Sequence, residues 1–166
     1  YETVKSLLPA NWPTSDIDSE VASQVDIQTE VWEHIVDNVD EWKMVEEEEE
    51  HPAYLRQKNL NMHGVGQRAI VNAVARLRLE SVKDWTKRLS VLSSIDWRIE
   101  NPEWQNIAVQ GGRVNNTSTS VKLLSAAVEK KLGLKIDSEL DEVLSSVDTI
   151  RRQKTPRKRR NTSSRS

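Results

Sequence analysis

Apolar residues recur every three or four positions in several stretches of the chain, the spacing that places side chains on one face of an α-helix. The alternation that indicates a β-strand is rare, and the candidates are short pieces at Ile107–Gln110 and Asn59–Met62. The pattern therefore predicts a mainly α fold, an irregular bundle of about five helices with at most minor short strands. The predicted helices span residues 16–40, 64–80, 82–93, 121–132 and 137–147.

Helix ends and turns are predicted by proline, glycine and capping side chains. Asn101 precedes Pro102, so the asparagine can cap a helical turn whose first position is the proline. We expect this turn to carry Trp104 inward. Gly111-Gly112 should end the segment that follows, because residues without a Cβ adopt left-handed conformations easily.

The loop after the two glycines leads into the helix predicted at 121–132, which Gly133 should close. Arg113 lies in this loop. The start of a helix favours an anion, so Arg113 is a candidate for phosphate contact. An ordinary helix connection with one solvated arginine is the alternative.

The apolar pattern assigns residues 16–148 to a single helical domain. Residues 1–15 form a lead-in interrupted by Pro9 and Pro13, and residues 149–166 are expected to be a disordered basic tail. The chain begins at Tyr1 without a methionine, and its first residues already resemble the middle of an element. We therefore expect the C-terminal part of a larger protein.

Charge is distributed unevenly along the chain, although the total is only −2. Residues 1–50 hold 15 acidic and 2 basic residues, a net charge of −13. Residues 51–150 carry +3, and residues 151–166 carry +8 with no acidic residue. The acidic third should repel a nucleic-acid backbone and the tail should attract one. Glu46–Glu50 are interpreted as a solvated run, with phosphate mimicry as the alternative.

Several functional classes are excluded or disfavoured. The chain has no cysteine, which excludes disulfides, cysteine-ligated zinc and a cysteine nucleophile. His34 shares a helix face with Glu30, but a single histidine is a weak metal signal, and a solvated face is favoured. Gly64-Val65-Gly66 lacks the third glycine and the preceding strand of a nucleotide-binding loop. We expect no enzyme activity, cofactor or metal.

Membrane association is not expected either. No apolar run approaches the length that spans a bilayer, and no signal peptide is visible. A cytoplasmic protein is the default expectation.

The six tryptophans, with no phenylalanine, are unusual. Exposed tryptophans can stack on nucleic-acid bases. Trp32 and Trp85 fall on apolar stripes and are expected in the core.

A family resemblance is carried by blocks of tryptophans, glycines and helix ends. The C-terminal half contributes Asp96-Trp97-Arg98, Asn101-Pro102-Glu103-Trp104-Gln105, Gly112-Arg113, Val121-Lys122-Leu123-Leu124 and Leu132-Gly133-Leu134. The upstream elements are Trp32, Trp42, Leu55-Arg56 and His63-Gly64. With these blocks the chain resembles DndB-type proteins, members of the DGQHR-domain family found with bacterial DNA phosphorothioation systems. The similarity covers most of residues 16–140.

This resemblance implies a DNA-associated regulator of phosphorothioation genes, with DNA and other proteins of that system as partners. The Asp-Gly-Gln-His-Arg signature of the family is absent, and the run His63–Arg68 is not that motif. The resemblance therefore implies that the chain lacks the part of the family that carries the signature. A homo-oligomer is possible.

Two hypotheses follow. In the first, the chain is a DNA-binding regulatory module. In the second, it is a helical protein–protein interaction or scaffold module of a larger nucleotide-using DGQHR-domain protein, with a nonspecific basic tail. Arginine and lysine side chains suit phosphate contact, and arginine also suits base edges. The predicted nucleic-acid-binding residues are Arg68, Arg76, Lys83, Lys87, Arg98, Arg113, Arg157, Lys158, Arg159 and Arg160.

One arrangement for part of this set is a helix-turn-helix-like pair formed by the helices predicted at 64–80 and 82–93. The second helix would then direct Lys83, Thr86, Lys87 and Ser90 toward DNA. An ordinary helix pair that binds nothing is the alternative.

Overall fold

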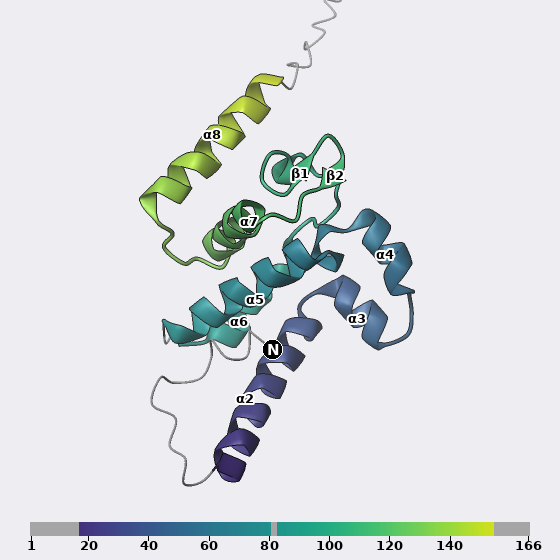
Figure 1. Ribbon diagram of the computed structural model, residues 1–166, viewed down its shortest axis with the longest axis vertical. Helices are drawn as coiled ribbons and strands as arrows, with labels where there is room; N and C mark the ends of the chain where they lie inside the picture. The colour runs from purple at the N-terminus through teal and green to yellow at the C-terminus, as the bar shows by residue number, and fades with distance from the viewer. Residues whose placement is uncertain (1–16, 81–82, 155–166) are drawn as a thin grey trace, which may run out of the picture.

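A computed structural model describes residues 17–80 and 83–154 of the chain (Figure 1). These residues form seven α-helices, three short 3-10 turns and one two-stranded antiparallel hairpin, which confirms the mainly α prediction. The α-helices are α2 (Ile17–Asp37), α3 (Asp40–Glu46), α4 (Pro52–Lys58), α5 (Gly64–Leu79), α6 (Trp85–Leu89), α7 (Ser118–Lys131) and α8 (Ser138–Lys154). The 3-10 turns are η1 (Leu60–Met62), η2 (Leu92–Ser94) and η3 (Pro102–Trp104), and the strands are β1 (Val109–Gln110) and β2 (Arg113–Val114).

Helices α5 and α7 form the centre of the molecule and make the most extensive contact between described elements (Figure 1). Their facing surfaces are rich in small residues, which lets two helix backbones approach closely. Ala69 and Ala73 of α5 and Ala126 and Ala127 of α7 are all buried. Gly66 lets η1 approach the start of α5 closely, because a Cβ there would lie 2.3 Å from the backbone oxygen of Leu60.

The first predicted helix, at residues 16–40, is α2, and a separate helix that was not predicted, α3, follows it. α2 ends at Asp37, and the Nδ2 atom of Asn38 donates a hydrogen bond of 2.8 Å to the carbonyl of His34. After the buried Val39 the chain turns into α3, which carries Trp42 into the core. The prediction that Trp32 lies in the core is wrong, since 52% of this residue is exposed.

The helix predicted at residues 82–93 is also wrong in length. Asp84 adopts a left-handed conformation with φ of 63°, and α6 covers five residues before η2 follows. Serine hydroxyls bond back to carbonyls three residues earlier, a local alternative to helix continuation. These bonds are donated by Ser90, Ser93 and Ser94 to the carbonyls of Lys87, Ser90 and Val91 at 2.8, 2.8 and 2.7 Å. A five-residue helix is too short to span a DNA groove, so the helix-turn-helix interpretation is rejected.

The predicted glycine break is the turn of the hairpin. Gly111 and Gly112 have φ of 58° and 75°, and β1 and β2 pair Val109 with Val114 and Gln110 with Arg113. The extended piece predicted at Asn59–Met62 is instead η1, preceded by an isolated bridge between Asn59 and Arg98.

α7 begins three residues earlier than predicted, and its end follows the prediction. Thr117 caps its start by accepting a hydrogen bond of 3.1 Å from the backbone N–H of Ser120. Gly133, with φ of 78°, lies just beyond its end.

Helix α8 extends further than predicted. It begins after Asp137, whose side chain accepts a hydrogen bond of 2.9 Å from the backbone N–H of Glu139. It is attached to the core through buried Leu144, with Leu140 and Val147 half-buried, and it continues to Lys154. The start of the predicted disordered tail is therefore helical, whereas Arg157, Lys158, Arg159 and Arg160 lie outside the described residues.

Candidate nucleic-acid interface

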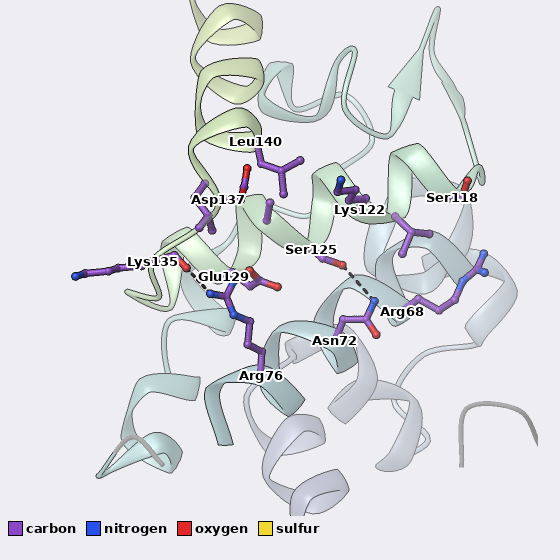
Figure 2. A pocket seen from close by; sticks show the side chains of 13 residues that line it. Arg68, Asn72, Arg76, Ser118, Lys122, Ser125, Glu129, Lys135, Asp137 and Leu140 are labelled. Atoms are coloured by element: carbon purple, nitrogen blue, oxygen red, sulfur yellow. Dashed lines mark hydrogen bonds and ion pairs between the residues drawn. The ribbon is translucent and has the colours of Figure 1, made fainter. Parts of the chain in front are cut away.

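A groove of about 820 Å3 runs between α5 and α7 and is closed at one end by the start of α8 (Figure 2). Residues spaced four apart on a helix lie on one face, so α5 presents Arg68, Asn72 and Arg76 to the groove. The amide of Asn72 donates a hydrogen bond of 3.4 Å to the hydroxyl of Ser125 on α7. The groove thus combines a polar floor with two of the predicted DNA-contacting arginines.

Arg76 joins three elements at one end of the groove. Its guanidinium forms an ion pair with Glu129 of α7, and its Nη2 atom donates 2.5 Å to the carbonyl of Lys135 (Figure 2). It also forms an ion pair with Glu80. Burial alone would lower the pKa of Arg76, but hydrogen bonds and charge from Glu129 and Glu80 raise it overall. With two carboxylates already paired to it, Arg76 connects α5 to α7 and has little charge left for a phosphate.

Arg68 is held by neutral groups. Its Nη2 atom donates 2.6 Å to the Oδ1 atom of Asn116, and its Nε atom donates 3.1 Å to the carbonyl of Gly64. These bonds orient the guanidinium without cancelling its charge. Arg68 therefore keeps a full positive charge at the open end of the groove.

Two further cations, Lys122 and Lys135, line the groove and were not among the predicted residues. Within residues 17–80 and 83–154, no ion pair involves Lys122, Lys135 or Arg68. Lys122 had a signal in the sequence, since it follows Val121 at the start of the apolar stripe and must face outward. Lys135 had none, because its position depends on how the chain leaves Gly133.

The other residues that line the groove include two carboxylates, which reduce its net positive charge, and several apolar side chains. Glu129 is occupied by Arg76, and Asp137 caps the start of α8. The remaining surface is apolar or carries hydroxyls: Ser118, Val121, Ala126, Ile136 and Leu140. The groove is thus an open cationic channel with apolar patches.

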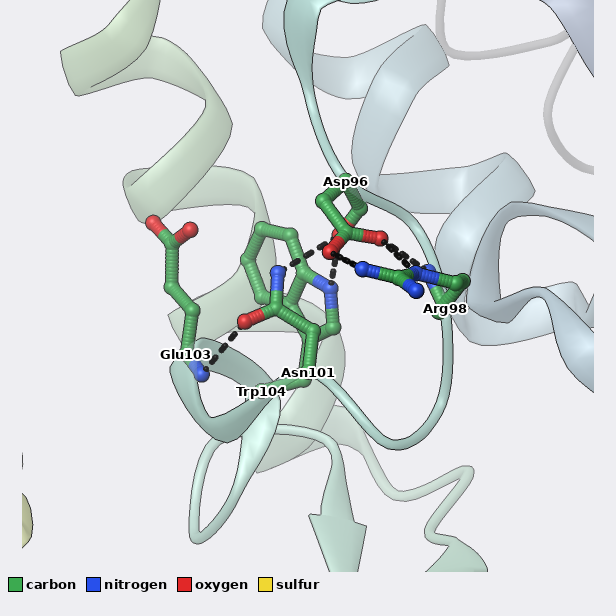
Figure 3. Close-up of polar contacts among 5 residues, drawn as sticks. All are labelled: Asp96, Arg98, Asn101, Glu103 and Trp104. Carbon is green, nitrogen blue, oxygen red and sulfur yellow. Dashed lines mark hydrogen bonds and ion pairs between the residues drawn. The ribbon is translucent and has the colours of Figure 1, made fainter. Parts of the chain in front are cut away.

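Arg98 lies elsewhere and is paired with Asp96 (Figure 3). Its Nε and Nη2 atoms donate to the two carboxylate oxygens of Asp96 at 2.8 and 2.6 Å, a bidentate arrangement. The hydrogen bond from the Arg98 side chain lowers the pKa of Asp96, although partial burial opposes the shift. Arg98 is therefore largely neutralised, and it lines a separate pocket of about 480 Å3 beside Lys58.

The tryptophan-rich block next to Arg98 is structural. Trp97 and Trp104 stack with ring centroids 5.5 Å apart, and both are buried. The Nε1 atom of Trp104 and the Nδ2 atom of Asn101 donate to the carbonyl of Asp96 at 2.8 and 2.7 Å (Figure 3). As predicted, Asn101 also caps η3 by accepting from the backbone N–H of Glu103 at 3.0 Å.

The remaining predicted cations within the described residues are dispersed. Lys87 pairs with Asp84 at 3.5 Å, Lys83 is exposed beside it, and Arg113 is exposed on β2. None of these three lines the α5–α7 groove. Of the ten predicted residues, the structure brings Arg68 and Arg76 together.

Two features are absent from the described part of the chain: a metal-binding cluster and a membrane-spanning helix. No group of three histidine, aspartate or glutamate side chains within it is placed to hold a metal ion. No helix in residues 17–80 and 83–154 combines the length and apolar character needed to cross a bilayer.

Comparison with known families adds a decisive observation. The family model of DndB, described as DNA-sulfur modification-associated, matches residues 1–135. The chain belongs to the DndB family. The match includes α5, α7 and the cations Arg68, Lys122 and Lys135, so most of the groove lies within the DndB region. Comparison with curated proteins and with solved structures gives no match.

Proposed function

We propose that this DndB-family chain is a DNA-associated regulatory module of the DNA sulfur modification system, and that the α5–α7 groove contacts the phosphate backbone. Family membership associates the chain with DNA sulfur modification. DNA contact is inferred from the groove, and a regulatory role from the resemblance. The proposal is a binding role and assigns no catalytic step.

The observation that carries the proposal is the set of three cations, Arg68, Lys122 and Lys135, that line one groove without an acidic partner among the described residues. Like charges brought together repel one another, so such a set is more stable when an anion lies between its members. A DNA strand presents a phosphate to each cation and releases counterions on binding.

Residues around the cations fit a nucleic-acid backbone. Ser118 lies at the start of α7, where free N–H groups also favour an anion, and Asn72 and Ser125 offer an amide and hydroxyl on the floor. Such contacts position a duplex without reading its sequence. Preference for a promoter would have to come from additional base contacts.

Duplex binding measured by fluorescence anisotropy across a salt series tests the proposal. The test variant of the full chain is Lys122→Gln/Lys135→Gln. The matched control is Lys43→Gln/Lys130→Gln, which removes the same charge from lysines that already pair with Glu47 and Asp141. The slope of log affinity against log salt is negative, and each lost phosphate contact reduces its magnitude by about 0.9. We expect a reduction of about 1.8 for the test variant and a much smaller change for the control.

The comparison of duplexes tests the regulatory part. A duplex from the promoter of the sulfur modification genes and a scrambled duplex are titrated side by side. Preference for the promoter supports regulation, and equal binding leaves only nonspecific association. If both lysine pairs reduce binding equally, the groove is not the site.

A further inference from the structure

The surface formed by α2 and α3 carries an exposed aromatic platform. Trp32 of α2 stacks on Trp42 of α3, with ring centroids 5.4 Å apart and ring planes inclined by 23°. Trp42 is buried and fixed by a hydrogen bond of 3.2 Å from its Nε1 atom to the carbonyl of Asn61. One face of Trp32 is thus covered by a rigid neighbour, yet 52% of the residue remains exposed. Val25, two turns earlier on the same side of α2, is 55% exposed.

Carboxylates border this platform. Asp26, Glu30, Glu33 and Asp37 follow one another at helical spacing along α2, and all four are exposed. Helix α2 contains no lysine or arginine, and its single histidine, His34, lies 3.9 Å from Glu30. The stripe spans about 16 Å at 1.5 Å per residue. A partner for this surface must therefore combine positive charge with side chains that stack on tryptophan.

Arginine meets both requirements, because its planar guanidinium stacks on an indole and binds carboxylates in a bidentate manner. The chain itself contains such a segment, Arg157-Lys158-Arg159-Arg160, in the last 16 residues with a charge of +8 and no acidic residue. Four extended residues cover about 10 to 13 Å, close to the length of the stripe. We propose that Trp32 and the α2 carboxylates dock the basic segment 157–160 of a second copy of this chain.

A second copy is favoured over the same chain by the arrangement of the helices. α2 and the end of α8 lie at opposite ends of the molecule (Figure 1). The donor segment and the acceptor surface are different parts of the chain, so the contact is head-to-tail and leaves one donor and one acceptor free in each dimer. Association should therefore grow with concentration and weaken with salt.

Sedimentation velocity of the full chain at low salt tests the proposal with two complementary variants. Trp32→Ala removes the platform and keeps the basic segment. Replacing Arg157, Lys158, Arg159 and Arg160 by glutamine removes the basic segment and keeps the platform. Each variant alone should associate at least about tenfold more weakly than the wild type. A 1:1 mixture of the two should form a dimer, because one intact donor meets one intact acceptor.

Two further variants serve as controls for the Trp32→Ala result. Leu79→Ala removes another exposed apolar side chain, 80% exposed at the end of α5, and should associate as the wild type does. Glu33→Lys/Asp37→Lys reverses the charge beside an intact Trp32 and should abolish association. This variant tests the proposal even where Trp32→Ala does not fold.

A wild-type chain that stays monomeric at low salt overturns the proposal, as does a mixture of the two variants that remains monomeric. The fluorescence of Trp32 is also compared with and without the basic segment. A difference that does not depend on protein concentration indicates docking within one chain, which also overturns the proposal. Duplex binding by the Trp32→Ala variant, measured below the concentration at which the wild type associates, should equal that of the wild type. The self-association and the DNA proposal can therefore fail independently.

Discussion

Asn61 donates a hydrogen bond of 2.6 Å from its Nδ2 atom to the Oε2 atom of Glu41, across 20 positions of sequence. Asn61 is fully buried at the junction of η1 and α5, and its backbone carbonyl also accepts from Trp42. The Oδ1 atom of Asn61 has no hydrogen-bond partner among the described residues. The amide thus anchors α3 to the centre of the fold at the cost of one unsatisfied acceptor.

Asn61→Asp should destabilise the fold by roughly 3 kcal/mol at neutral pH, because it buries a carboxylate against Glu41. Burial and the like charge would raise the folded pKa of this new carboxyl above its unfolded value of about 3.9. The variant should therefore approach wild-type stability below about pH 4 and lose stability as the pH rises through its folded pKa. Urea unfolding at several pH values measures this. Adding Glu41→Gln should restore part of the loss, and an equal loss at every pH would contradict the explanation.

Gly66→Ala should cost at least about 1–3 kcal/mol, because the new Cβ meets backbone atoms of Leu60 and Asn61 at 2.3 and 2.6 Å. Gly64→Ala, two residues earlier in α5, is the matched control. There the nearest atom is the Nδ2 of Asn116 at 3.6 Å, so alanine should be neutral or stabilise by up to about 1 kcal/mol. Thermal unfolding of both variants distinguishes close backbone packing from helix propensity.

Trp104→Phe should destabilise the chain by about 1–3 kcal/mol, because it leaves part of a fully buried site empty and removes the donor to the Asp96 carbonyl. Trp32→Phe makes the same substitution at a half-exposed position and should lower the free energy of unfolding by well under about 1 kcal/mol. Denaturant midpoints of the two variants give the comparison. Equal losses would show that Trp32 is more tightly packed than its exposure indicates.

Arg98→Gln should raise the pKa of Asp96 toward its ordinary value, because the side-chain hydrogen bond from Arg98 lowers it. The lowered pKa means that this pair contributes stability above the ordinary aspartate pKa and loses it as the pH falls through the folded pKa. The contribution should be small, since both side chains are exposed to solvent. Carboxyl NMR titration of Asp96 measures the shift. An unchanged pKa in the variant would show that backbone groups alone maintain it.

Helical periodicity predicted α5 well, because α5 buries one regular face. It also located α7, although five consecutive residues of α7, 124–128, are buried. It failed at α6, where the left-handed Asp84 and the serine back-bonds stop a helix that the apolar spacing favoured. It also misplaced Trp32, since an apolar stripe does not reveal how much of it a neighbouring helix covers.

The candidate interface was predictable only in part. Arg68 and Arg76 share a helix face and could be paired from spacing alone. The pairing of Arg76 with Glu129 joins residues 53 positions apart and required the packing of α5 on α7. Lys135 entered the groove through the turn at Gly133, which no periodicity describes. Charge alone therefore identified candidates, and tertiary contacts separated available cations from neutralised ones.

Helix α8 continues for seven residues beyond Val147, which packs against the core. At 1.5 Å per residue this part of the helix is about 10 Å long. It acts as a spacer that sets both the reach and the heading of whatever follows Lys154. Inserting one residue there would turn the following chain by about 100°, whereas inserting a whole turn would chiefly lengthen the spacer. The direction in which the chain leaves α8 is thus set by the phase of the helix as well as by its length.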